Sequence, residues 1–153
     1  MLSPIKVLTS PAQHTATIRL VVPADAIQNV MGPAIQELYN TLAKQGVPPS
    51  GALFCRHFHP PDEEFDFEVG LPVNAPIQAH GRVHPSSLPS TRVVQTVYQG
   101  GYERLGDAWE KFDAAIDIGG YEVSEMLWER YVRGPESCPD ASHYLTELNR
   151  PLR

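Results

Sequence analysis

Hydrophobic and polar residues alternate in several short stretches of the chain, and each of these stretches predicts a β-strand. The predicted strands cover residues 14–22, 52–58, 65–71, 91–98, 125–133 and 142–148. Two other stretches repeat their apolar residues every three to four positions, which predicts helices over residues 26–45 and about 102–118. The segment from 72 to 90 shows little periodicity and contains four prolines, so we interpret it as a crossover linker.

The residues at the helix ends are those that commonly start and stop helices. Asp25 is a candidate N-cap of the first helix, and Gly46 follows its last residue. Pro33 lies inside the apolar pattern, and proline is favoured in a first turn, so the helix proper is expected to begin near it. Gly119 and Gly120 are expected to end the second helix.

The two halves of the chain repeat one pattern. LFCRHFHPP at 53–61 aligns with LWERYVRGP at 127–135, and FEVGLPV at 67–73 aligns with TELNRPL at 146–152. Each half reads as strand-helix-strand-strand, which leaves a sheet edge and a sheet face that a second half can cover. We therefore predict an α+β fold: a tandem repeat of two such units with pseudo-two-fold symmetry, about eight antiparallel strands and two main helices.

The repeat also predicts the domain organisation. Residues 1–153 are expected to form a single domain, with a first half over about 14–73, a linker over about 74–90 and a second half over about 91–152. A groove between two such halves is a natural place for a ligand.

Composition and charge exclude several classes of protein. The formal net charge of −6 and the pI near 5.4 argue against direct binding to nucleic acid, because phosphate contacts need clustered Lys and Arg. The sequence has no apolar run long enough for a membrane span and no apolar core of a signal peptide near its start. Cys55 and Cys138 are too few for a disulfide scaffold, so we expect free thiols in a cytoplasmic protein.

The predicted strand over residues 125–133 carries a carboxylate among apolar residues. Side chains alternate along a strand, so Leu127, Glu129 and Tyr131 share one face. A carboxylate that is buried beside apolar groups has a raised pKa and is costly in its charged form unless something pairs with it. Glu129 is therefore either the polar group of a ligand pocket or a surface carboxylate that pairs with a neighbouring arginine.

Several short motifs occur in an order that resembles a known family. They are YQGGY at 98–102, a helix with Leu105 and Trp109, the pair Glu129-x-Tyr131, TELxxP at 146–151 and EVGLPV at 68–73. Together they resemble the GyrI-like small-molecule-binding domain, also called the AraC-type effector-binding domain, from about residue 14 onward. Members of that family fold as tandem strand-helix-strand-strand units and bind small, often aromatic and cationic molecules.

The resemblance implies a function and a set of site residues. In the family, a buried glutamate on the strand that matches residues 125–133 neutralises cationic ligands, and here that position is Glu129. The chain has no room for the DNA-binding domain of some members, so we expect a stand-alone binding protein for lipophilic aromatic molecules, preferentially cations. A desolvated anion between aromatic walls independently favours a delocalised cation. The side chains expected to line the groove with Glu129 are Tyr131, Trp109, Tyr144, Tyr102 and His57.

A second hypothesis is enzymatic, because some GyrI-like relatives hydrolyse the strained cyclopropane rings of genotoxic natural products. They use a tryptophan and glutamates, and the corresponding residues here are Trp109, Glu129 and Glu147. Two carboxylates in different environments could divide the roles of general acid and general base. However, Glu147 repeats Glu68 of the first half, which favours a structural role for both.

Two further hypotheses rest on weaker patterns. The acidic turn at residues 62–64 could contact a basic protein partner, although exposed charges are usually only solvated. Cys55, His57 and His59 share a face of a predicted strand, but they spread over roughly 13 Å, which is too far for one metal ion. We therefore expect neither a metal ion nor another cofactor.

Overall fold

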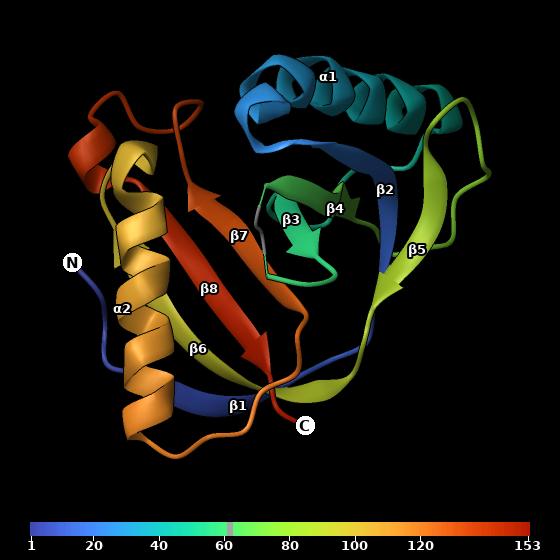
Figure 1. Cartoon of the computed structure of the whole chain (residues 1–153). Helices are drawn as coiled ribbons and strands as arrows, with labels where there is room; N and C mark the ends of the chain where they lie inside the picture. Colours follow the sequence, from blue (N-terminus) through green and yellow to red (C-terminus); the bar gives the residue numbers. More distant parts are fainter. Residues whose placement is uncertain (61–62) are drawn as a thin grey trace.

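All eight strands join one curled antiparallel sheet in the computed structural model, which describes residues 1–60 and 63–153 (Figure 1). The strand order across the sheet is β1-β6-β8-β7-β3-β4-β2-β5. The strands are β1 (Lys6–Ser10), β2 (Gln13–Pro23), β3 (Phe54–His57), β4 (Glu64–Pro72), β5 (His84–Leu88), β6 (Thr91–Gln99), β7 (Leu127–Arg133) and β8 (Leu145–Pro151). The helices are α1 (Ile27–Gln45) and α2 (Leu105–Ile118), with short 3₁₀ turns at Ala24–Ala26, Tyr102–Arg104 and Ala141–His143.

The sheet order confirms the predicted fold class and its pseudo-two-fold symmetry. The strand order is the same from either edge once β1, β2, β3 and β4 are exchanged for β5, β6, β7 and β8. The first strand of each half pairs with the other half: β1 pairs with β6, and β5 pairs with β2. These two pairings place β1 and β5 at the two edges of the sheet, and each pairing joins the two halves.

The interpretation of residues 74–90 as a linker is wrong in one respect, because β5 lies within it. The strand β1 was also not predicted. Both are short edge strands, and β5 includes Pro85, which an edge strand tolerates because one of its sides needs no hydrogen bonds. Neither strand is long enough or regular enough to produce a clear alternation.

The pseudo-two-fold axis passes between Cys55 and Glu129. The sequence repeat aligns these two residues with each other, and the register of β3 against β7 places them directly opposite one another. On either side of this pair, Phe54 lies opposite Arg130 and Arg56 lies opposite Trp128. Glu129 therefore occupies the centre of the sheet, where the two halves meet.

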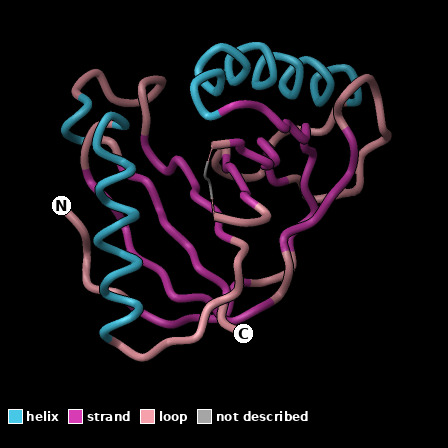
Figure 2. The backbone as a smooth tube through the Cα atoms, in the orientation of Figure 1, coloured by secondary structure: helices cyan, strands magenta, loops and turns pink. Residues whose placement is uncertain are grey.

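Both helices pack on the same face of the sheet. A row of side chains crosses six strands on this helix-bearing face, in the order Ile18, Val69, Cys55, Glu129, Leu148 and Thr96. The helix α1 packs its buried Leu38 against the first-half part of this face, and α2 packs its buried Phe112 against the second-half part. Figure 2 shows the two helices as separate cyan coils against the magenta strands.

The opposite face of the sheet carries none of the helices in residues 1–60 and 63–153, and we call it the helix-free face. Its apolar core is small and consists of Phe54, Leu88, Val93 and Trp128. The side chains of Arg56, Trp128 and Arg130 point to this face, because they alternate with Cys55 and Glu129 along β3 and β7. The two faces therefore present different chemistry at the same axis.

The first helix ends as predicted but begins differently. Gly46 follows α1 in the left-handed conformation with φ of 67°, and its N–H caps the carbonyls of Leu42 and Ala43. Asp25 lies in the preceding 3₁₀ turn, and its expected capping bond is not formed. The helix begins at Ile27 rather than near Pro33, because Val30 and Met31 pack against the core and hold the turn before the proline.

The last strand begins later than the predicted range of 142–148. Asp140 accepts a hydrogen bond from the backbone N–H of Ser142 and so stabilises a 3₁₀ turn there. The strand β8 then runs to Pro151 through Asn149 and Arg150, two buried polar residues that hide its strand pattern in the sequence.

Two other expectations bear on the class of protein. Cys55 and Cys138 are both free thiols, as predicted. Among the residues described here, no helix combines the length and apolar character that a membrane crossing requires.

Candidate functional site

Glu129 is buried and is held by two neutral hydrogen-bond donors. Its side chain lies on the helix-bearing face of β7, and the residue is 8% exposed. Trp109 Nε1 on α2 donates to Glu129 Oε2 at 2.8 Å, and the Tyr131 hydroxyl donates to Glu129 Oε1 at 2.7 Å. Within the described part of the chain, Glu129 forms no ion pair with any basic side chain, so the alternative of a surface carboxylate paired with an arginine is wrong.

The surroundings of Glu129 act on its protonation. Burial raises its pKa above the usual value, and the hydrogen bonds from Trp109 and Tyr131 offset only part of that rise. Both donors are uncharged, so they satisfy the carboxylate oxygens without neutralising the charge. A cation that reached this position would neutralise the charge, and a buried anion gains most from such a partner.

A row of aromatic rings extends from Tyr131, which donates to this carboxylate. The rings of Tyr102 and Tyr131 lie 5.8 Å apart in an edge-to-face arrangement, and those of Tyr102 and Tyr144 lie 5.2 Å apart. Burial raises the pKa of Tyr102 to about 12, so its hydroxyl stays neutral at physiological pH. The structure thus brings together five of the predicted residues, which we call the Glu129 cluster: Trp109, Tyr102, Glu129, Tyr131 and Tyr144.

Cys55 belongs beside this cluster, although the sequence suggested it only as a rejected metal ligand. It lies opposite Glu129, it interacts with the Tyr131 hydroxyl, and burial raises the pKa of its thiol far above the usual range. The thiol is therefore neutral and adds polarisable, uncharged surface next to the carboxylate. The signal was present in the repeat, which aligns Cys55 with Glu129.

His57 lies on the helix-bearing face but packs within the first half. Its ring stacks on Phe67 at 5.3 Å between centroids and meets the edge of Phe65 at 5.6 Å. Burial lowers the pKa of His57 to about 4, with a smaller contribution from His59, and its Nδ1 has no hydrogen-bond partner in the described residues. The described contacts of His57 are with the core and not with the Glu129 cluster.

The lowered pKa of His57 predicts an acid-induced loss of stability. Below pH 6.5 the unfolded chain takes up a proton that the folded chain takes up only near pH 4, so stability falls between these values. At about 1.4 kcal/mol per pH unit, the loss is at most about 3 kcal/mol. Urea unfolding of the wild type and of His57→Phe at pH 7 and pH 4 measures it. An equal pH dependence of the free energy of unfolding in both proteins would contradict the prediction. The raised pKa of Glu129 has the opposite effect on stability, but this effect is the same in both proteins and cancels in the comparison.

Glu147, the third residue of the enzymatic hypothesis, points to the opposite side of the sheet. Leu148 is the β8 residue that lies opposite Glu129, so Glu147 alternates onto the helix-free face. There it pairs with Arg130 at 3.4 Å, as Glu68 pairs with Arg56 at 3.6 Å in the first half. The repeated pairs fit the structural role that the repeat suggested for both glutamates.

The acidic turn, the metal site and the groove between the halves are the remaining features that the sequence suggested. Asp62 of the acidic turn lies outside them. The structure describes no group of three or more His, Cys, Asp or Glu side chains that could hold a metal ion in residues 1–60 and 63–153. The cavity between the halves lies on the helix-free face, and its lining includes none of the Glu129 cluster. Glu129, at the centre of the cluster, is itself only 8% exposed.

Comparison with known proteins identifies the family that this architecture matches. The chain matches the GyrI-like small molecule binding domain over residues 3–153. No curated protein sequence matches it significantly. The EcmrR C-terminal domain is similar in structure, with a TM-score of 0.85 and 18% identity over 98% of this chain and 97% of that domain. EcmrR in its complex with DNA has the same TM-score at 20% identity, and this chain spans 57% of that protein.

Two other similar structures are a protein with a bound ligand and a hydrolase. SAV2435 bound to tetraphenylphosphonium has a TM-score of 0.69 and 12% identity, over 99% of this chain and 94% of that one. A hydrolase encoded by lin2189 from Listeria innocua has a TM-score of 0.65 and 14% identity, over 97% and 91% of the two chains. At these identities the similarity establishes a common fold.

Proposed function

Because this chain belongs to the family of GyrI-like small molecule binding domains, we propose that it binds lipophilic aromatic cations at the Glu129 cluster. One observation carries the proposal. Within the part of the chain that the structure describes, Glu129 is a buried carboxylate whose two oxygens are held only by the neutral donors Trp109 and Tyr131. Such a group is desolvated without being neutralised, and it favours a ligand that brings a positive charge.

The aromatic rings of the cluster favour a particular kind of cation. A delocalised or shielded charge loses little hydration on entering an apolar site, and aromatic faces attract it through their quadrupoles. Tyr102, Tyr131 and Tyr144 offer such faces beside the carboxylate. A compact, strongly hydrated cation would lose more hydration than these groups replace. The tetraphenylphosphonium bound to SAV2435, a protein of the same fold, belongs to the favoured class and supports the proposal.

Binding requires part of the cluster to move. Glu129 is 8% exposed, so a ligand with several rings reaches it only after an aromatic side chain is displaced. Tyr102 is the most exposed ring of the cluster at 39%, and it is held by contacts with two other tyrosines. We expect Tyr102 to give way first, after which the ligand replaces its ring contacts.

A titration with two ligands of similar shape tests the proposal. Tetraphenylphosphonium carries a positive charge, whereas triphenylphosphine oxide is neutral and presents three of the same rings. Isothermal titration calorimetry is expected to show tighter binding of the cation by about 1–3 kcal/mol, the usual value of a hydrogen-bonded or paired buried charge. Equal affinity for both ligands would refute the role of charge, and binding of neither would refute the site.

The raised pKa of Glu129 predicts that cation binding weakens in acid. The free protein takes up a proton on Glu129 at a pH above the usual 4.5, and the protonated carboxyl no longer attracts a cation. The bound cation lowers this pKa, so affinity falls roughly tenfold per pH unit between the two pKa values. Tetraphenylphosphonium affinity measured from pH 8 down to pH 4.5 checks this. The affinity of triphenylphosphine oxide should stay flat over the same range.

A second candidate function is hydrolysis of strained cyclopropane rings. It is favoured by the direct bond between Trp109 and Glu129 and by the raised pKa of Glu129, because a carboxyl with a raised pKa keeps its proton to a higher pH and is a better general acid than an ordinary carboxyl. Glu147 lies on the other face of the sheet and would have no part in it. Product analysis with the wild type, Glu129→Gln and Glu147→Gln tests this function. A substrate that stays intact with the wild type would exclude it.

A further inference from the structure

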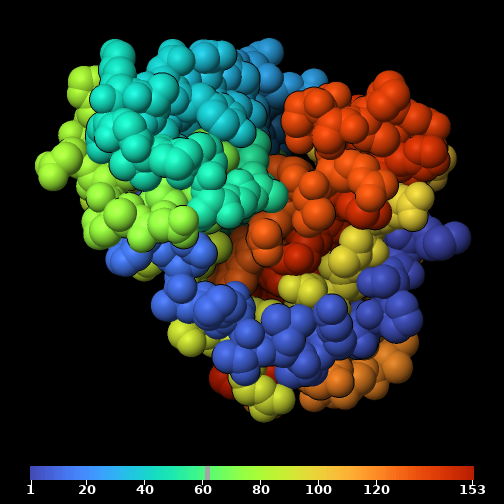
Figure 3. Space-filling model, turned by 180° about the vertical axis from the view of Figure 1, so that it is seen from behind, coloured from blue at the N-terminus to red at the C-terminus, as the bar shows by residue number. Residues whose placement is uncertain are grey.

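The cavity of the helix-free face lies between the two halves. It has a volume of about 190 Å³, and residues of both halves line it. Figure 3 shows this side of the molecule, hollowed between the N-terminal segment in blue and the teal loop above it. The lining side chains that the argument uses are Phe54, Gln95, Trp128, Arg130, Glu147 and Asn149. The sheet separates this cavity from the Glu129 cluster.

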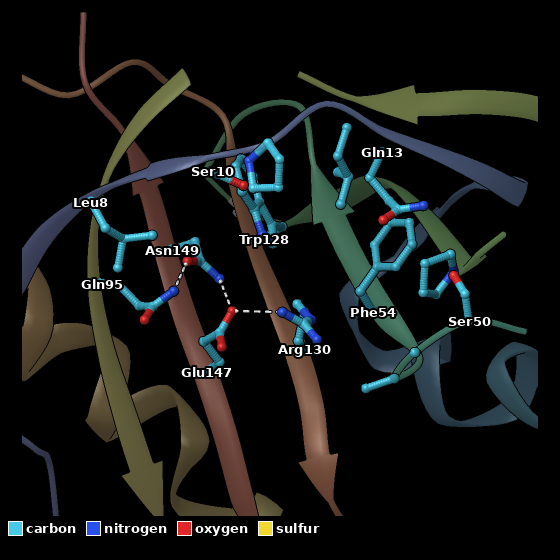
Figure 4. Close-up of a pocket in the computed structure, with 15 residues that line it drawn as sticks. Leu8, Ser10, Gln13, Ser50, Phe54, Gln95, Trp128, Arg130, Glu147 and Asn149 are labelled. Carbon is cyan, nitrogen blue, oxygen red and sulfur yellow. Dashed lines mark hydrogen bonds and ion pairs between the residues drawn. The ribbon is translucent and has the colours of Figure 1, made fainter. Parts of the chain in front are cut away.

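A chain of hydrogen bonds forms one wall of the cavity (Figure 4). Gln95 Nε2 donates to Asn149 Oδ1 at 2.8 Å, and Asn149 Nδ2 donates to Glu147 Oε1 at 3.2 Å. Arg130 Nη1 donates to the same carboxylate oxygen at 3.4 Å. These bonds fix the orientation of the Asn149 amide, because its oxygen accepts from Gln95 while its nitrogen donates to Glu147.

This chain leaves donors and acceptors for a further molecule. Across the described residues, Gln95 Oε1 and Glu147 Oε2 accept no hydrogen bond, and Arg130 Nε and Nη2 donate none. None of these atoms is among the fully buried unpaired ones, so each keeps some accessible surface, and the residues that carry them line the cavity. This wall can therefore both donate hydrogen bonds to one edge of a ligand and accept hydrogen bonds from it.

The fold itself does not require these amides. The repeat aligns Asn149 with Gly70, and the residue opposite Gly70 on β2 is Thr17, as Gln95 is opposite Asn149 on β6. In the first half the Phe54 ring packs on Gly70, where an added Cβ would lie 2.8 Å from Phe54 Cζ. The second half replaces this compact arrangement with two buried amides, which cost free energy unless they are fully hydrogen-bonded.

The charge and size of the cavity restrict its ligand. Arg130 and Glu147 neutralise each other, so an added anion or cation meets a like charge as well as an opposite one. The apolar part of the lining includes Leu8, Leu88 and the aromatic side chains of Phe54 and Trp128. A cavity of about 150 Å³ in another protein holds benzene, so this one has room for a single ring with a small substituent.

We propose that this cavity is a second binding site, for neutral planar molecules with one aromatic ring and a hydrogen-bond donor and acceptor on one edge. Heteroaromatic carboxamides have this chemistry. The donor of the ligand meets Gln95 Oε1 or Glu147 Oε2, its acceptor meets Arg130, and its ring lies against the apolar lining, which includes Leu8 and Ala52. The site takes a different class of ligand from the Glu129 cluster and does not depend on it.

Nicotinamide is a suitable probe, because it is neutral and carries one ring and one carboxamide. Titration of the ¹⁵N-labelled protein is expected to shift the side-chain amide signals of Gln95 and Asn149 to saturation. A dissociation constant on the order of 1 mM is expected for a fragment of about nine non-hydrogen atoms. Toluene, which has the ring alone, should shift these signals far less at equal concentration.

Two variants and one matched control test the placement. Glu147→Gln keeps the size of the side chain but changes the free acceptor, and is expected to weaken nicotinamide binding about tenfold. Glu68→Gln alters the equivalent pair of the first half, outside the cavity, and should leave binding unchanged. Ser50→Trp, on an exposed loop at the rim, should block the cavity while leaving the remaining spectrum intact.

The proposal has clear points of failure. It is overturned if nicotinamide causes no saturable shift, if toluene binds equally well, or if Ser50→Trp binds like the wild type. It is also overturned if Glu129→Gln abolishes the shifts, because the probe would then occupy the other face. Retained binding in Glu129→Gln, together with loss in Glu147→Gln, supports two independent sites.

Discussion

Replacing Glu129 with glutamine is expected to weaken the binding of tetraphenylphosphonium by about 1–3 kcal/mol, the same difference that the charge of Glu129 makes between the cation and the neutral ligand. Glutamine keeps the size of the side chain and can still accept the bond from Trp109 Nε1. The Tyr131 hydroxyl, which donates to the carboxylate, can instead accept from the new amide. The substitution therefore removes the charge and spares most of the packing. Isothermal titration calorimetry at pH 7.5 measures the loss.

Two controls separate the charge of Glu129 from general damage. Triphenylphosphine oxide should bind the wild type and Glu129→Gln with similar affinity, because it has no charge to neutralise. Glu147→Gln removes a carboxylate from β8 on the helix-free face of the sheet. This variant should bind tetraphenylphosphonium as the wild type does. If Glu129→Gln binds the cation as the wild type does, Glu129 has a structural role and the proposed placement of the cation at the Glu129 cluster is wrong.

Replacing Trp128 with alanine is expected to lower the free energy of unfolding by about 3–5 kcal/mol, as is usual for a large buried aromatic residue. Trp128 is 2% exposed and is one of the largest fully buried side chains. It belongs to the small core of the helix-free face, where no helix can move in to fill the space. Urea unfolding followed by circular dichroism measures the change, because the substitution also removes a fluorophore.

A neighbouring residue on the same strand provides the matched control. Val132 is 51% exposed, so Val132→Ala should change the free energy of unfolding by less than about 0.5 kcal/mol. Trp128→Phe, which keeps an aromatic ring, should fall between the two. A loss below about 1 kcal/mol in Trp128→Ala would mean that the cavity of the helix-free face collapses onto the gap.

The strand β7 serves both faces of the sheet through its alternation. Trp128 and Arg130 contribute to the cavity of the helix-free face, and Glu129 between them contributes to the cluster on the helix-bearing face. A substitution that shifted the register of β7 by one residue would exchange the two sets. The register is secured on both sides, because β3 and β8 each pair with β7.

The sequence by itself determined the fold class and the central carboxylate. Alternation and helical periodicity are local properties, so they identified six strands and both helices without tertiary information. The repeat of residues 53–61 in residues 127–135 implied two equivalent halves, and two such halves bury their edges only by pairing. The position of Glu129 within an apolar stretch marked it as a costly, and therefore informative, carboxylate.

Only the tertiary structure decided which side chains meet. The faces of β7 and β8 depend on their mutual register, which placed Glu147 opposite Arg130 and away from Glu129. The edge strands β1 and β5 exist because the other half supplies their partners, a long-range contact that their own residues do not signal. The bond from Trp109 to Glu129 and the cavity of the helix-free face likewise arise from how the halves pack, because distant segments come into contact only in the folded chain.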